Sequence, residues 1–189
     1  MSILIEKRGV FDSIQDLGRQ GFRKFGINPS GVMDRAAARL INTLLGNDED
    51  EAVLEMHFPA PVIRFQKDAI IALGGANFEA SIEDENLRNW QAHTVSRGSV
   101  LRFTKKHHGN RCYLAVKGGF EIKRWLGSAS TNSRARIGGF EGRTIENGDE
   151  IRFSGVKTLD MPMEKPIIAR SLVPRYNNSP IIRFIAGAE

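Results

Sequence analysis

Short, closely spaced apolar segments fill the chain after residue 47 and limit what it can fold into. Turn residues such as Gly109-Asn110 and Asn147-Gly148-Asp149 separate them. The gaps leave no room for crossover helices, so the pattern favours an antiparallel sandwich or barrel. The strands predicted in this way, with a short opening strand before them, are residues 2–10, 52–58, 62–65, 69–73, 78–82, 94–95, 100–104, 111–116 and 150–153.

Two segments near the N-terminus depart from this pattern. Residues 11–32 are rich in glycine and polar residues, which is typical of a long and specific loop. From Met33 or Asp34 to Leu45 the apolar residues recur at spacings of three and four, and Gly46 then gives a stop signal. The sequence therefore predicts one clear helix over about 34–45, with Asp34 in its first turn, where a negative charge complements the helix dipole.

Composition excludes several classes of protein. The 189 residues, of which 41% are hydrophobic, suffice for one sizeable core and argue against disorder. No apolar run approaches the roughly 18 residues of a membrane span, and charges occupy the N-terminus where a signal peptide would be apolar. We therefore expect a cytoplasmic protein that makes no use of a membrane.

Charge and cysteine content narrow the choice further. The formal net charge is +5, but Lys and Arg are dispersed instead of forming a basic block, so a nucleic-acid partner is not expected. The single cysteine, Cys112, excludes an internal disulfide and is predicted as a core thiol. Because His107 and His108 are adjacent, a strand would point them to opposite faces, and we predict no metal site.

The end of the chain differs from the rest. Four prolines in residues 161–180 indicate a linker or an edge-hugging connection. An apolar-Arg-Phe string recurs at 62–65, 100–103, 150–153 and 181–184. Either barrel strands converge on this string, or residue 181 opens a second domain that resembles the first. The predicted organisation is a β domain over 1–160, a linker over 161–180, and the start of a second, missing half over 181–189.

Three clusters combine residues that can carry chemistry. Asp16 and Arg19 lie in the glycine-bearing loop before the helix, where they can form a polar pocket or merely pair with each other. Paired glycines follow the strand that contains Arg111, and a third cluster combines hydroxyls with further glycines. Such groups can hold a carboxylate or a developing oxyanion, although glycines at strand ends are also ordinary bulges and turns.

Taken together, these strings resemble one known family. QDLGR, SGVMD, AVLE, RCYLAVKGG, LGSAST, GGFEGR and NGD occur in the family's order between Gln15 and Asp149. The family is that of the C component of bacterial 5-oxoprolinase, also described as allophanate hydrolase subunit 2 or KipA-like. The resemblance implies a mainly β fold, an antiparallel cyclophilin-like β-barrel in two similar halves. It further implies a subunit of an ATP-dependent 5-oxoprolinase, which hydrolyses 5-oxoproline to glutamate.

The resemblance also implies roles for particular residues. Arg111 is expected to bind a carboxylate or phosphate, and three hydroxyls are expected to act with it in catalysis: Ser128, Ser130 and Thr131. The residues expected to bind substrate or shape its pocket are Asp16, Arg19, Ser30, Asp34, Gly118, Gly119 and Gly139. Family members usually carry Arg where this chain has Ala129, and they are considerably longer, so both departures weaken catalysis by this chain alone.

Partners and cofactors follow from the same resemblance. The expected partners are a protein of the KipI type, which is the B component of 5-oxoprolinase, and an A component of the LamB/YcsF type. The chain alone is expected to bind no cofactor, while the assembled enzyme uses ATP. One alternative is the carboxyltransferase component of a biotin-dependent urea carboxylase or allophanate hydrolase system. Another is a non-enzymatic, KipA-like regulator that binds a kinase-inhibitor protein.

Overall fold

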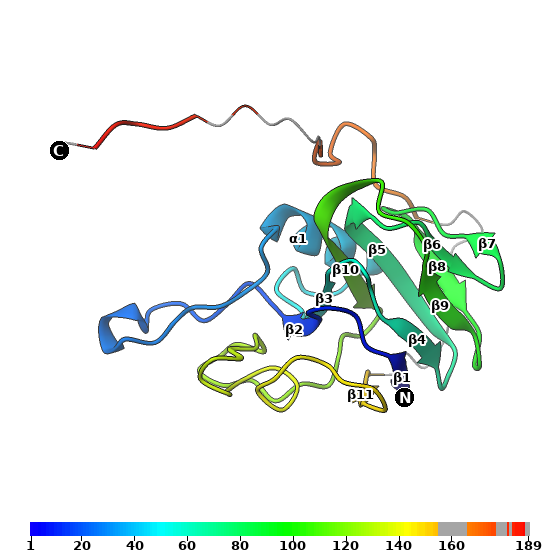
Figure 1. Ribbon diagram of the computed structural model, residues 1–189, viewed down its shortest axis with the longest axis horizontal. Coiled ribbons are helices and arrows are strands. Elements are labelled where there is room, and N and C mark those ends of the chain that lie inside the picture. Colours follow the sequence, from blue (N-terminus) through cyan, green and yellow to red (C-terminus); the bar gives the residue numbers. More distant parts are fainter. Residues whose placement is uncertain (155–165, 177–180, 182, 188–189) are drawn as a thin grey trace.

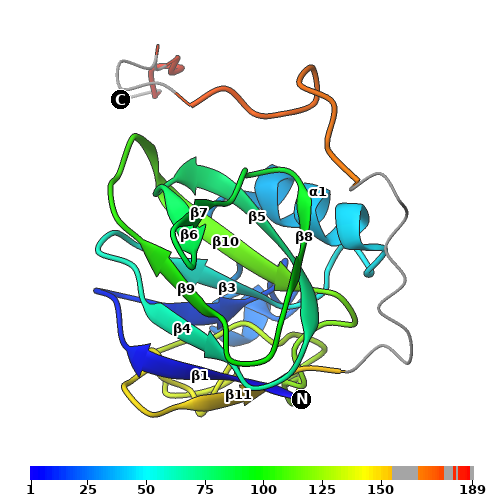
Figure 2. The same ribbon diagram turned by 90° about the vertical axis from the view of Figure 1, so that its right-hand side faces the viewer.

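Two antiparallel sheets form the body of the protein in a computed structural model that describes residues 1–154, 166–176, 181 and 183–187. One α-helix packs beside the second sheet (Figures 1 and 2). The first sheet has the order β11 (Glu150–Arg152), β1 (Ser2–Lys7), β4 (Val62–Phe65), β9 (Val100–Phe103), β6 (Ala80–Ile82) and β7 (Glu85–Asn86). The second has the order β2 (Ser13–Gln15), β3 (Val53–Met56), β10 (His108–Val116), β5 (Ala69–Asn77) and β8 (Ala92–Val95).

Side-chain alternation along the central strands builds two apolar cores. On β10, Cys112 and Leu114 belong to the core between the sheets, whereas Tyr113 and Ala115 belong to the core under the helix. Both faces of β10 are therefore buried from Cys112 to Val116, which explains why this part of the strand is a continuous apolar run. The predicted core thiol is confirmed, and burial raises the pKa of Cys112 to about 12.

The predicted helix is confirmed, together with the residues predicted to begin and end it. Helix α1 (Arg35–Leu45) begins after Asp34, whose carboxylate accepts a hydrogen bond from the backbone N–H of Ala37 at 3.0 Å. Gly46 ends it in the left-handed conformation. A β-carbon at Gly74 of β5 would lie 2.5 Å from the side chain of Ile41, so glycine at this position lets α1 approach the sheet.

The predicted fold class, mainly antiparallel β with one helix, is confirmed, and three details differ. The expected loop over 11–32 contains β2 and a short 3-10 helix, η1 (Arg23–Phe25). Strand β2 forms because it pairs with β3, a tertiary contact that local composition does not reveal. Strand β5 continues through Gly74 and Gly75 to Asn77, and β7 was not expected.

The C-terminal region is described only in part. Residues 166–176 pack on the domain: the backbone N–H of Ile168 donates to the carbonyl of Trp90 at 2.8 Å, and Val173 and Tyr176 join the core under α1. The predicted boundaries at 160 and 180 and the 181–184 string include residues outside the described part, so they stay predictions. None of the helices in the described ranges is long and apolar enough to cross a bilayer.

Candidate functional site

The carboxylate of Asp16 organises the segment after residue 124. Its Oδ1 accepts hydrogen bonds from the hydroxyls of Ser128, at 2.6 Å, and Ser130, and from the backbone N–H of Gly18 at 2.7 Å. Its Oδ2 accepts from the backbone N–H of Ala129. All five residues form the Asp16 hub, and Asp16 itself is only 3% exposed. Oδ1 therefore has three donors and Oδ2 has one, and Nη1 of Arg124 also lies 3.5 Å from Oδ2.

Arg19 joins the hub indirectly. Its Nη2 donates to the carbonyl of Ser130, while Nη1 donates to the hydroxyl of Ser30 at 3.1 Å and to the carbonyl of Asn28 at 3.3 Å. Asp16 and Arg19 are therefore connected through Ser130, because the Asp16 oxygens are taken by other donors. Burial lowers the pKa of Arg19, and the negative charge of Asp16 opposes that effect.

The hydroxyl groups of the hub have little left to offer a ligand. Ser130 Oγ accepts from the backbone N–H of Asp16, and Ser128 Oγ accepts from the N–H of Ser130, both at 3.0 Å. Each serine thus donates its proton to Asp16 and also accepts a hydrogen bond. Thr131 donates its hydroxyl proton to the carbonyl of Ile14 at 2.8 Å. These contacts attach the segment 128–131 to the edge of β2.

An open pocket of about 350 Å³ lies beside the hub. The Arg19 guanidinium lies 5.1 Å from the centre of the Trp125 ring, which is part of the pocket wall. Gly138 and Gly139 have positive φ, and a β-carbon at either position would collide with Ser130 or Thr131. The residues that line this Trp125 pocket are Lys123, Trp125, Arg136, Ile137, Gly138, Gly139, Glu141 and Gly142.

Arg111 lies in a different cluster, on β10. Its Nε is 3.8 Å from Oε1 of Glu55, and Glu55 Oε2 accepts from the hydroxyl of Tyr113 at 2.9 Å and from the backbone N–H of Met33 at 2.8 Å. The ring of Phe11 meets that of His57 edge-on at 5.5 Å. Burial lowers the pKa of His57, and the positive charge of Arg111 lowers it further. We call Phe11, Met33, Glu55, His57 and Arg111 the Arg111 face.

The structure separates Arg111 from the hydroxyls with which it was predicted to act. Strand β10 pairs with β3, β3 pairs with β2, and Thr131 bonds to β2. Two strands therefore lie between the backbone of β10 and the segment that carries the hydroxyls, and among the described residues no hydrogen bond or ion pair joins Arg111 to them. The catalytic roles assigned to these residues stay predictions.

Gly118 and Gly119 occupy a third place, the turn after β10. The N–H of Gly118 donates to the side chain of Asn47 at 2.8 Å, and the same side chain donates to the carbonyl of Val116 at 2.9 Å. A β-carbon at Gly119 would meet the side chain of Glu51 at 2.6 Å. These contacts give both glycines a role in the turn.

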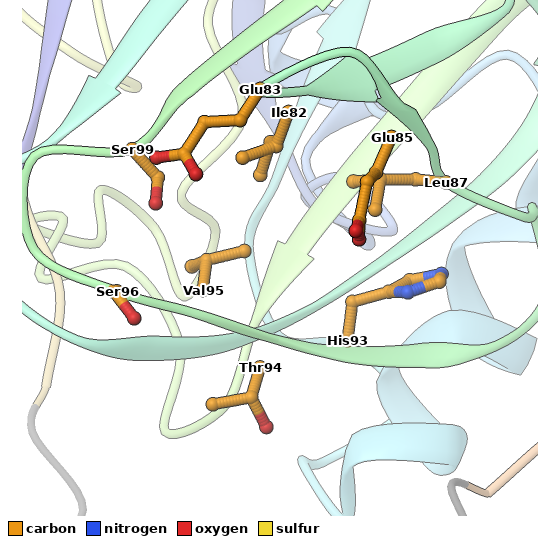
Figure 3. Close-up of a pocket in the computed structure, with 9 residues that line it drawn as sticks. All are labelled: Ile82, Glu83, Glu85, Leu87, His93, Thr94, Val95, Ser96 and Ser99. Atoms are coloured by element: carbon orange, nitrogen blue, oxygen red, sulfur yellow. The ribbon is translucent and has the colours of Figure 1, made fainter.

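A further pocket of about 260 Å³ lies between the β6–β7 turn and β8. Figure 3 shows Glu83 and Glu85 on one side of it and Val95 and His93 on the other. The Nε2 atom of His93 lies 2.8 Å from the carbonyl oxygen of Arg88. None of the predicted site residues lines this pocket, so the Trp125 pocket is the better candidate.

Comparison with known proteins decides the family. Residues 25–189 match the carboxyltransferase domain, subdomains A and B. The chain belongs to this family. Two relatives of this carboxyltransferase-domain chain are the C component of the 5-oxoprolinase of Escherichia coli, which is 37% identical over 78% of the chain, and urea amidolyase of Saccharomyces cerevisiae, which is 32% identical over 94%. These matches cover 47% and 10% of the two proteins.

A solved structure supports the same relationship. The crystal structure of K. lactis urea amidolyase matches with a TM-score of 0.85 and 30% identity, over 94% of this chain and 11% of the amidolyase. The carboxyltransferase-domain chain spans about half the length of the E. coli relative. The activity of a whole relative therefore bears on this chain only as a proposal.

The structure brings some of the predicted site residues together and places others elsewhere. The hub and its surroundings bring together Asp16, Arg19, Ser30, Ser128, Ser130, Thr131 and Gly139. Asp34 lies nearer the Arg111 face, because its backbone N–H donates to the Tyr113 hydroxyl at 2.8 Å. Ala129, where relatives were expected to carry Arg, is 1% exposed and packs in the core between the sheets.

Several residues of the Arg111 face and the Trp125 pocket were not predicted from the sequence. Glu55 is a charged residue inside an apolar strand, and that contrast was a usable signal. Trp125, Lys123 and Arg136 gave no comparable signal, since only the tertiary fold places them around one pocket.

Proposed function

We propose that this chain is part of a component of a 5-oxoprolinase-type enzyme and that the Trp125 pocket holds its substrate. The observation that carries the proposal is the combination of Lys123 and Arg136 with an indole wall and three glycines in one pocket. The relationship to the C component of 5-oxoprolinase supports the choice of substrate.

The chemistry of 5-oxoproline fits such a pocket. The molecule has a carboxylate and a cyclic amide, so a site needs cations for the first and hydrogen-bond donors for the second. Lys123 and Arg136 supply the positive charge, and the apolar ring of the substrate can lie against Trp125. Opening the amide builds negative charge on its oxygen, which nearby donors stabilise. ATP would be used by partner proteins to activate that oxygen.

The hub supports this proposal by positioning the pocket and not by taking part in the reaction. Asp16 fixes the backbone at Ser128 to Ser130, and Arg19 connects that backbone to Trp125. The wall is thereby held before a ligand arrives, which reduces the ordering cost of binding.

A second function is favoured by the family match and by the urea amidolyase relatives. A carboxyltransferase component would use the same pocket for a urea-like acceptor, which carries no carboxylate. The carboxyl carrier, a biotin group, would belong to another chain. A KipA-like regulator, the third reading, would need no substrate in this pocket.

Reconstitution tests the proposal and separates these readings. The chain is combined with partner proteins of the LamB/YcsF and KipI types, and ATP hydrolysis is measured with and without 5-oxoproline. We expect 5-oxoproline to stimulate hydrolysis, and replacing Lys123 and Arg136 by Ala to raise KM roughly ten- to hundredfold for each lost charge-assisted hydrogen bond. Arg134→Ala is the matched control, because Arg134 is exposed and does not line the pocket.

Three outcomes of this experiment separate the candidate functions. Stimulation by urea instead of 5-oxoproline would favour carboxyl transfer. If no combination of partner proteins couples ATP hydrolysis to either compound, the enzymatic reading is lost and the regulator remains. An unchanged KM in the Lys123 and Arg136 variants would remove the Trp125 pocket as the substrate site.

A further inference from the structure

The Arg111 face contains polar groups without partners. Four buried side-chain nitrogens have no hydrogen-bond partner among the described residues, and two of them, His57 Nδ1 and Arg111 Nε, belong to this face. A third, His108 Nδ1, lies close by, because His108 stacks on Tyr176, whose hydroxyl donates to Asp34 at 2.6 Å. Buried polar atoms are normally satisfied, so three unmatched nitrogens in one region call for an explanation.

The charge of Arg111 is only loosely balanced. Its distance of 3.8 Å from Glu55 is too long for a hydrogen bond, and Oε2 of Glu55 is already shared by Tyr113 and Met33. Within the described part of the chain, its Nη1 donates to the carbonyl of the preceding residue, Asn110, at 3.0 Å and to no other group. Nε itself is buried, but the side chain as a whole is 29% exposed, so an approaching carboxylate can reach the outer part of the guanidinium.

Exposed apolar side chains flank this polar centre. Phe11 is 47% exposed and contacts His57, while Met33 is 73% exposed and its backbone bonds to Glu55. Single exposed apolar residues are common, but here two of them belong to residues connected to the Arg111 cluster, Phe11 through His57 and Met33 through Glu55. Arginine, aromatic residues and Met are enriched at protein-binding interfaces.

We propose that the Arg111 face is a docking surface for a partner protein, which places an Asp or Glu carboxylate on Arg111 and apolar side chains over Phe11 and Met33. The positive charge of Arg111 favours a carboxylate as its ligand. The exposed side chains of Phe11 and Met33 favour a protein over a small anion. The proposal rests on the proposed function only in taking the partner from the same enzyme, as its KipI-type component.

Binding measurements with that purified KipI-type partner test the surface. Titration calorimetry compares the unmodified chain with Arg111→Glu and with Arg102→Glu, a matched charge reversal at an exposed position of β9 on the other sheet. We expect Arg111→Glu to weaken binding about tenfold or more and Arg102→Glu to change it by no more than about twofold. Thermal unfolding establishes that each variant is folded.

Hydrogen exchange gives a second measurement that needs no variant. Binding is expected to slow exchange in segments 31–34 and 55–57 and to leave β9 unchanged. Equal affinities for Arg111→Glu and Arg102→Glu, absent protection, or failure of the unmodified chain to bind the partner would each overturn the proposal. So would Arg111-dependent binding of inorganic phosphate combined with unaffected partner binding. A complex without 5-oxoproline-dependent ATP hydrolysis would instead count against the proposed function and leave this surface intact.

Discussion

The Asp16 hub and the Arg111 face use the same residue types in opposite ways. Asp16 follows the edge strand β2, Glu55 lies on the neighbouring strand β3, and each has an arginine close by. At the hub the carboxylate has four donors, whereas at the face the arginine lies 3.8 Å from its acid. The Asp16 carboxylate holds the backbone of its neighbours, although Arg19 Nε beside it has no partner among the described residues. At the face, the arginine itself is loosely held, which leaves binding capacity at the surface.

The same contrast gives a structural role to the two serine hydroxyls that were predicted to be catalytic. Ser128 and Ser130 were candidates because hydroxyls beside glycines can stabilise an oxyanion. In the fold, both protons go to Asp16. Both hydroxyl protons are thus occupied, and under the proposed function the donors to a ligand come from the Trp125 pocket.

Removing the carboxylate of the hub tests this contrast with the largest expected effect. Asp16→Ala leaves two hydroxyls and two backbone N–H groups unpaired and removes the negative charge near Arg19, so we expect a loss of about 3–5 kcal/mol in the free energy of unfolding. Urea unfolding followed by Trp fluorescence measures it. Asp50→Ala is the control, since Asp50 is exposed and shares with Asp16 only a contact to Arg124. A loss below about 1 kcal/mol would show that the hub is not structural.

Asp12 provides an intermediate case, at the other end of β2. It is 1% exposed and accepts two backbone hydrogen bonds, from Gly9 at 2.7 Å and from His57 at 3.3 Å. Burial therefore raises its pKa from 3.8 to about 6. The folded state holds this proton more tightly than the unfolded state, so the stability contributed by protonation is present below about pH 4 and is lost as pH rises through 6.

This shift predicts a pH-dependent difference between two proteins. The free energy of unfolding of the unmodified chain, minus that of Asp12→Asn, is expected to fall by about 2 kcal/mol between pH 4 and pH 7. Urea unfolding at a series of pH values gives the difference and cancels the contributions of other groups. If the two proteins show parallel curves of unfolding free energy against pH, the hydrogen bonds to Asp12 balance the cost of removing its carboxylate from water, and its pKa is not raised.

Sequence patterns predicted the parts of the fold that local physics determines. The helix was found because Leu40, Ile41 and Leu44 fall on one face before Gly46, and most strands because apolar runs end at turn residues. Strand β2 was missed since its three residues depend on pairing with β3. In the same way, β7 forms only beside β6.

The site was predicted less well, for a related reason. The contacts between Asp16 and Ser130 span 114 positions in the chain, and no spacing rule reports such a distance. Family resemblance identified these residues as important, but resemblance gives no geometry. It grouped Arg111 with Ser128, whereas strand order places β3 and β2 between them.

The smallest expected effect is the sharpest test of the face. Arg111→Met keeps most of the side-chain volume and removes a charge whose ion pair is long and partly exposed, so we expect the free energy of unfolding to change by less than about 1 kcal/mol. Tyr113→Phe is the comparison within the same cluster. Its buried hydroxyl donates to Glu55 and accepts from the N–H of Asp34, and removing it should cost about 1–3 kcal/mol. If urea unfolding shows that Arg111→Met costs as much as Tyr113→Phe, Arg111 serves the fold as Asp16 does, and the docking surface loses its physical basis.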